Sequence, residues 1–215
     1  METLGAWLAD ADRVYAADGA ADLCRAAGRE ADVVVGDFDS ISIEAREGAR
    51  DLRRRPDQNL TDADKVLAEI TADGWKEATV CGLEGDLPDH ELAALGSCLT
   101  AFDRDALSIT LRYRRGRAWF VSHERPFQQE LEAGTRLSLM PMEPADGIDL
   151  EGVIWPLENA RLGICGIGSI SNRAAGGIVR ATVRSGVVWL FIADEARPGP
   201  PTSGRRISRI SLQSG

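Results

Sequence analysis

Histidines, lysines, paired cysteines and long apolar runs are scarce or missing in this sequence of 215 residues. No stretch approaches the roughly 20 consecutive apolar residues that a membrane-spanning helix requires. The segment from Met1 to Asp12 lacks the basic and then apolar pattern of a signal peptide. We therefore expect a cytoplasmic protein with no membrane partner.

The four cysteines are widely separated and include no Cys-x-x-Cys pair. Neither a disulfide framework nor a zinc site is indicated, so we expect reduced, mostly buried thiols. Positive charge is also in the minority, because the formal net charge is -9. A surface that binds nucleic acid needs an excess of clustered Lys and Arg, so we expect no nucleic-acid partner and favour a small-molecule ligand.

The first half of the sequence alternates short apolar runs with helical patterns. The run at 33–35 is Val-Val-Val, which is typical of a strand buried on both faces. Further strands are expected at 13–17, 52–55 and 78–81, and helices at 20–27, 61–70 and 89–102. This alternation predicts an α/β domain with a mostly parallel sheet over residues 1–118.

From about Leu107 onward the helical patterns disappear and strands with turn signals follow one another. Strands are expected at 107–113, 118–122, 135–140, 148–154, 178–184 and 187–192. This pattern predicts a smaller, all-β, sandwich-like domain over residues 119–195. The remaining residues, 196–215, are rich in Pro, Ser and Arg and are expected to form a mobile tail.

Paired carboxylates follow the valine run. Asp37 and Asp39 come directly after a predicted buried strand, and ligands of open α/β sheets bind at the carboxyl ends of the strands. Asp18 ends the first strand, and Asp62 begins a helix. Carboxylates that converge in this way suit magnesium, which also keeps water and phosphate ligands. An isolated Asp-x-Asp more often only caps a turn, but the additional aspartates favour the metal site.

A polar loop from Pro56 to Thr61 leads into the helix that contains Lys65. Free backbone amides at the helix start, the Thr61 hydroxyl and the Lys65 ammonium are suited to a polyphosphate. An ordinary N-cap at Thr61 and an ordinary salt bridge at Lys65 are the competing interpretations.

These motifs, in this order, resemble the catalytic half of the thiamine pyrophosphokinase family. The resemblance rests on Asp18-Gly19-Ala20, on Gly36 to Ser40, and on Asp57-Gln58-x-x-Thr61-Asp62-x-x-Lys65. It implies Mg²⁺ bound by Asp37, Asp39 and Asp62, with Asp18 nearby, and ATP as the co-substrate. The residues that it places near ATP are Ser40, Asp57, Gln58, Thr61 and Lys65.

The resemblance continues through Gly82, Gly85, Asp89 and His90 into the β half. There the segments 152–157 and 169–172 resemble the Gly-x-x-Tyr/Trp-x-Leu and Ser-Asn segments of the family. These segments imply a thiamine site completed across a homodimer. Its expected residues are Asp89, Trp155, Ser169, Ser171 and Asn172. An aromatic residue in a strand more often packs in the core, which is the competing interpretation for Trp155.

Three departures from the family pattern leave other functions open. Asn59 replaces a frequent acidic residue, the loop 82–88 has no arginine, and the sequence begins close to the second family strand, so that the first strand is absent or replaced by residues 3–8. One alternative is a diphosphokinase that acts on a pterin alcohol. Another is a non-catalytic protein that binds a nucleotide or thiamine phosphate. The function that the resemblance implies is the transfer of a diphosphate group from ATP to the hydroxyl of thiamine. Its products are thiamine diphosphate and AMP.

Overall fold

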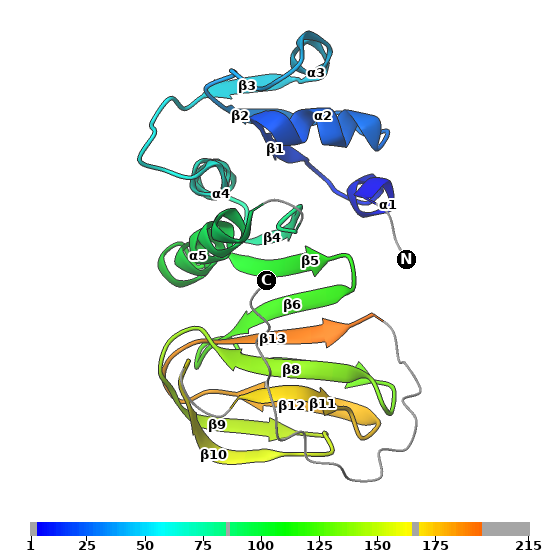
Figure 1. Cartoon of the computed structure of the whole chain (residues 1–215), viewed down its shortest axis with the longest axis vertical. Coiled ribbons are helices and arrows are strands. Elements are labelled where there is room, and N and C mark those ends of the chain that lie inside the picture. The colour runs from blue at the N-terminus through cyan, green and yellow to red at the C-terminus, as the bar shows by residue number, and fades with distance from the viewer. Residues whose placement is uncertain (1–3, 85–86, 165–167, 195–215) are drawn as a thin grey trace, which may run out of the picture.

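The computed structural model describes residues 4–84, 87–164 and 168–194 (Figure 1). The predicted tail at 196–215, Cys165, Gly85 and Asp86 lie outside these residues. The helices are α1 (Leu4–Ala9), α2 (Asp18–Ala26), α3 (Ile43–Gly48), α4 (Asp62–Ala72) and α5 (Pro88–Arg104). None of the described helices has both the length and the apolar character needed to cross a membrane.

The described strands form three sheets. The parallel sheet contains β1 (Tyr15–Ala17), β2 (Val33–Gly36) and β3 (Asp51–Arg54). The six-stranded sheet has the order β11-β8-β13-β6-β5-β4, and the four-stranded sheet has the order β10-β9-β12-β7. Their bounds are β4 (Glu77–Cys81), β5 (Ser108–Tyr113), β6 (Gly116–Val121), β7 (Phe127–Leu131), β8 (Arg136–Pro141), β9 (Ala145–Glu151), β10 (Leu157–Leu162), β11 (Ser169–Arg173), β12 (Gly177–Thr182) and β13 (Val188–Ala193).

The parallel sheet is built around the valine run. Val33, Val34 and Val35 are fully buried, and Val33 is in register with Tyr15 on β1 and with Asp51 on β3. Side chains of α1, α2 and α3 complete a small apolar core around Val34. Because β1 and β2 are adjacent and parallel, the residues that follow them lie at the same edge of the sheet.

The six-stranded and four-stranded sheets enclose the largest apolar core. Leu137, Leu139 and Leu190 on one sheet and Ile148 and Leu150 on the other belong to the same cluster and are fully buried. A separate cluster on the six-stranded sheet packs against α4 and α5. In Figure 1 the sheets and helices follow one another along the long axis, with the parallel sheet at one end and the four-stranded sheet at the other.

The prediction of a mostly parallel N-terminal sheet was right for β1 to β3 and wrong for β4 and β5. These two strands pair with each other in parallel but belong to the mixed six-stranded sheet. The reason is the two-residue turn Arg114-Arg115, which folds β6 back antiparallel onto β5 and so joins it to the C-terminal strands. β6 crosses the expected boundary between 118 and 119, which remains a prediction.

Between the parallel sheet and β4 lies a cavity of about 600 Å³, lined by β1, α4 and β4. In the described residues β1 pairs only with β2, and β4 pairs only with β5. Side chains connect the two sheets instead, since Trp75 Nε1 donates to the Tyr15 hydroxyl at 3.0 Å. Further contacts run through α4, where Glu69 binds Arg53 on β3 at 2.9 Å.

Candidate functional site

Three of the predicted carboxylates converge at the edge where β1 and β2 end. Asp18, Asp37 and Asp39 each offer an oxygen that lies within 4.8 Å of the others. Asp18 starts α2 directly after β1, and the other two follow β2. The parallel register of the two strands therefore produces the cluster, as the sequence indicated.

Asp18 is the most buried of the three, with 4% of its surface exposed. Its Oδ2 accepts a hydrogen bond from the backbone N–H of Phe38 at 2.6 Å. Its Oδ1 is buried and has no hydrogen-bond donor among the described residues. Burial raises the pKa of Asp18, the Phe38 hydrogen bond lowers it, and the neighbouring Asp37 raises it again.

Asp37 is more accessible and is held in its charged form. Burial by itself would raise the pKa of Asp37, but hydrogen bonds from Gln58 and from the Asp39 backbone bring the pKa below its ordinary value. Gln58 Nε2 donates to Asp37 Oδ2 at 2.9 Å. This contact brings the loop before α4, which the sequence linked to ATP, next to the carboxylate cluster.

The cluster fits a hard divalent cation. A buried carboxylate oxygen without a donor is costly unless a cation or a proton satisfies it, and Asp18 Oδ1 is such an atom. Three carboxylates would leave coordination positions for other ligands, which matches the preference of Mg²⁺ for a few carboxylates together with water and phosphate oxygens.

Asp62, the fourth predicted ligand, lies outside this group. Its Oδ1 accepts a hydrogen bond from Lys65 Nζ at 3.1 Å, and its side chain is 61% exposed. The charge of Asp62 nevertheless contributes to the raised pKa of Asp18, which indicates that it lies nearby. The Lys65 side chain is 6% exposed, so its ammonium is held at the edge of the site by Asp62.

The remaining residues of the loop make local contacts. Thr61 caps α4: its hydroxyl accepts from the Asp64 backbone, and Asp64 accepts from the Thr61 backbone, while Ser97 on α5 lies 2.9 Å from the same hydroxyl. Asp57 Oδ1 accepts hydrogen bonds from the backbone and the side chain of Asn59, at 2.9 and 3.0 Å. Ser40 is exposed beside the cluster.

The predicted thiamine residues of the β half form a second group. Asn172 is 1% exposed, and its Nδ2 donates to the carbonyl of Trp155 at 2.6 Å and to Ser169 Oγ at 3.0 Å. The Trp155 backbone N–H donates in return to Asn172 Oδ1 at 3.2 Å. Trp155 is 59% exposed, so it is not a core residue. Ser171 has a φ of 60° and accepts a hydrogen bond from Arg136 at 2.6 Å.

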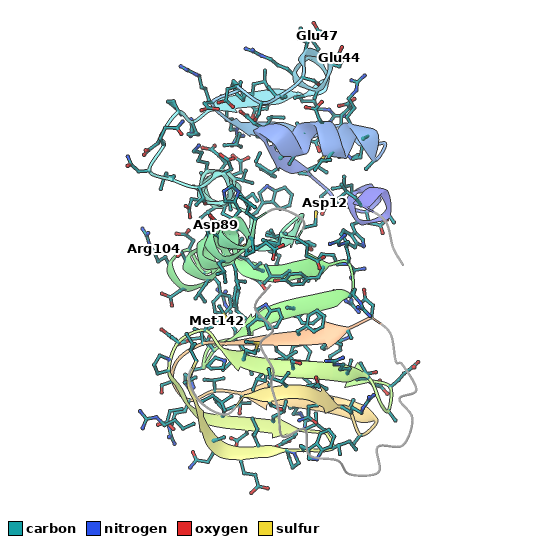
Figure 2. The ribbon with its side chains drawn as sticks, viewed as in Figure 1. Asp12, Glu44, Glu47, Asp89, Arg104 and Met142 are labelled. Atoms are coloured by element: carbon teal, nitrogen blue, oxygen red, sulfur yellow. The ribbon has the colours of Figure 1, made fainter. Side chains whose placement is uncertain are left out.

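The two groups are far apart within one chain. Figure 1 shows β1 and β2 at one end of the molecule and β11, which carries Ser169 to Asn172, in the sandwich at the other. Asp89 lies between them in the first turn of α5, where Figure 2 labels it. The Asp89 carboxylate accepts a hydrogen bond from the His90 backbone at 3.1 Å.

The roles of three contributors to the site were not predicted from the sequence. Ser97 comes from a helix far along the chain, and the Phe38 backbone acts through an uncommon φ of 70°. Gly36 provides the space for Asp18, because a Cβ atom there would lie 2.2 Å from Asp18 Oδ1. Only Gly36 left a signal in the sequence, namely a glycine at the end of a β-branched run.

Solved structures with the same fold include three thiamine pyrophosphokinases. The structure from Bacillus subtilis is 19% identical with a TM-score of 0.73, and the match covers 83% of this chain and 86% of that one. The structure from Geobacillus thermodenitrificans is 18% identical with a TM-score of 0.74, covering 89% and 91%. The structure from Candida albicans is 14% identical with a TM-score of 0.75, covering 90% and 85%.

Two family models match the sequence, while a comparison with curated proteins found no match. Residues 4–111 match the catalytic domain of thiamin pyrophosphokinase, and residues 122–188 match its vitamin B1 binding domain. The first match alone spans half of the chain and includes the whole carboxylate cluster. This chain therefore belongs to the thiamin pyrophosphokinase family.

Proposed function

We propose that this chain transfers a diphosphate group from ATP to the hydroxyl of thiamine, with Asp18, Asp37 and Asp39 as the ligands of Mg²⁺. The observation that carries the residue assignment is the convergence of these carboxylates within 4.8 Å beside a buried oxygen that has no donor. Asp62, whose charge acts on Asp18, would be a further ligand once Lys65 releases it. The family match supports the substrates.

The nucleotide lies beside the loop from Asp57 to Thr61. Gln58 already contacts Asp37, so a polyphosphate bound to this loop reaches the carboxylate cluster. Lys65 supplies the cation for the phosphates, since its ammonium has a single described hydrogen-bond partner. Ser40 and Thr61 offer further hydroxyl groups, although Thr61 also serves as the helix cap.

Thiamine binds near Trp155, whose exposed ring offers a flat apolar surface for an aromatic heterocycle. Asn172 fixes the backbone of Trp155 through two hydrogen bonds, and Ser169 accepts a third from the Asn172 side chain. Ser171 and Asp89 offer polar groups to the ligand. Because these residues and the carboxylate cluster lie far apart in one chain, we propose a homodimer in which each site combines both groups.

The reaction requires positioning and charge neutralisation more than covalent catalysis. The thiamine hydroxyl attacks the β-phosphorus of ATP, the bond from that phosphorus to the α-phosphate oxygen breaks, and AMP leaves. The hydroxyl proton passes to solvent. Mg²⁺, when bound, neutralises charge on the phosphate oxygens. Lys65 adds a further positive charge on the protein side.

The test is a direct turnover assay with protein, ATP, MgCl₂ and thiamine, in which AMP and thiamine diphosphate are measured. Equal amounts of both products should form, and EDTA should prevent their formation. A parallel reaction with a hydroxymethyl pterin in place of thiamine should give no diphosphate product. ATP binding without AMP release under these conditions would identify a non-catalytic member of the family.

A further inference from the structure

Gly36 lies directly against the Asp18 carboxylate. A Cβ atom on residue 36 would lie 2.2 Å from Asp18 Oδ1, 2.5 Å from Cγ and 2.9 Å from Oδ2. Non-bonded heavy atoms prefer separations of about 3.5–4.0 Å, so the space is already filled by Asp18. The carboxylate occupies the position that a side chain of residue 36 would take.

The need for glycine at this position is one of space. Gly36 is not among the glycines with a positive φ, so its backbone is in a conformation that any residue adopts. The three atoms nearest to such a Cβ all belong to Asp18. The first clash of a methyl group at residue 36 is therefore with the Asp18 carboxylate.

A second contact holds Asp18 against Gly36. The Phe38 N–H donates to Asp18 Oδ2 at 2.6 Å, and Phe38 reaches this orientation with a φ of 70°. The Arg46 guanidinium lies 5.5 Å from the centre of the Phe38 ring and packs against that residue. The Phe38 N–H thus holds one oxygen of the Asp18 carboxylate, and the other oxygen fits into the space that Gly36 leaves free.

We propose that Gly36 is a positioning residue for the metal site: its missing side chain allows the Asp18 carboxylate to reach Asp37 and Asp39. This inference rests on the metal site of the proposed function. Gly36 touches neither the ion nor a substrate. A methyl group at residue 36 moves the Asp18 oxygens away from the cluster and leaves Asp37 and Asp39 to bind the cation alone.

The first experiment measures metal binding without turnover. Mn²⁺ is titrated by isothermal calorimetry into the full chain and into Gly36→Ala, in the absence of nucleotide. Residues that orient a metal ligand typically change affinity by 10–100-fold, and we expect a weakening of about that size. Gly96→Ala is the matched control, because Gly96 lies in α5 with open space around a Cβ atom, and its Mn²⁺ affinity should not change.

The second experiment asks whether the effect passes through Asp18. In a double-mutant cycle, Gly36→Ala should lower both the urea midpoint and the Mn²⁺ affinity of the original chain. In an Asp18→Ala background the carboxylate is gone, so the added methyl group should change neither quantity. An equal loss in both backgrounds, or an unchanged Mn²⁺ affinity in Gly36→Ala, would overturn the proposal.

The two measurements separate this inference from the proposed function. If the chain and its variants behave as expected toward Mn²⁺ but thiamine diphosphate never forms, the positioning role stands and the proposed reaction is wrong. If the original chain binds no Mn²⁺, the proposed metal site is wrong, and so is the positioning role of Gly36. This holds even if the double-mutant cycle of urea midpoints shows coupling between residues 36 and 18.

Discussion

The ammonium of Lys65 donates a hydrogen bond to Asp62 at 3.1 Å, so an almost buried cation is held by a carboxylate that is largely exposed. Both residues lie in the first turn of α4, beside the loop that contacts Asp37 through Gln58. In the proposed function, a bound polyphosphate pairs with Lys65 and Asp62 turns toward the metal ion.

Lys65→Met should raise the Michaelis constant for ATP by about one to two decades, because a hydrogen bond to a charged group is worth about 1.5–3 kcal/mol. The methionine keeps most of the apolar stem. Lys76→Met is the matched control, since Lys76 is the only other lysine and is exposed. Steady-state kinetics with varied ATP measure the effect, and an unchanged constant would remove Lys65 from the nucleotide site.

Asp37→Asn and Asp39→Asn should each abolish magnesium-dependent turnover and leave the fold intact. Each change removes a charge but almost no volume, and both side chains lie at the edge of the sheet and not in the core. Circular dichroism and the turnover assay measure the two effects. Asp103→Asn, at an exposed position on α5, provides the control and should retain full activity.

The homodimer can be tested by mixing two inactive variants. Asp37→Asn removes a ligand from the carboxylate cluster, and Asn172→Ala disrupts the residues proposed to bind thiamine. If each site combines both groups from different chains, a mixed dimer contains one intact site. Random exchange should then restore about a quarter of the original activity. No recovery in mixtures that native mass spectrometry shows to contain mixed dimers would place the complete site in a single chain.

Asn59→Asp should raise the Michaelis constant for ATP. From the sequence alone, an aspartate here would be expected to strengthen the nucleotide site, because related proteins often have an acidic residue at this position. We expect the opposite, because the Asn59 side chain donates to Asp57 at 3.0 Å and an aspartate would place two carboxylates in contact. Asn59→Ser is the comparison variant, because it can still donate. A lower constant in Asn59→Asp would contradict this expectation.

The stability of the contact between α4 and β3 should depend on pH. Hydrogen bonds from Arg53, and a further one from Tyr15, hold the pKa of Asp73 below its ordinary value. A lowered folded-state pKa contributes stability above the unfolded value of about 3.9, and this stability is lost as the pH falls through the folded value. Asp73→Asn should therefore lower the urea midpoint at pH 7. The difference from the original chain should shrink below about pH 4, while Asp103→Asn should show no such trend.

The sequence predicted the elements that depend on local patterns. The valine run became β2, the Thr61 cap became the start of α4, and the carboxylates after β1 and β2 met at one edge. The strands predicted at 135–140 and 187–192 were found within one residue, as β8 and β13. In these segments burial, propensity and end signals all agree.

What could not be predicted depends on contacts between distant residues. The joining of β5 to the C-terminal strands is set by the turn at Arg114-Arg115, which carries no strong turn residue until Gly116. The elements that were not predicted have weak apolar patterns, and they are α1, α3, β7, β10 and β11. The partly buried hydrogen bonds of Asn172 to Trp155 cross 17 positions of the sequence, and no local signal indicates them.

The parallel sheet and β4 are not paired with each other, and this affects how easily the parallel sheet unfolds locally. The strands that carry Asp18, Asp37 and Asp39 share no ladder of backbone hydrogen bonds with the six-stranded sheet in the described residues. They are attached by α4 and by side-chain contacts such as Trp75 with Tyr15. Such units open at a lower free energy than a continuous sheet, so amide protons of β2 should exchange with solvent before those of β13. Binding of a metal ion across the ends of β1 and β2 would then slow exchange in this part of the molecule first.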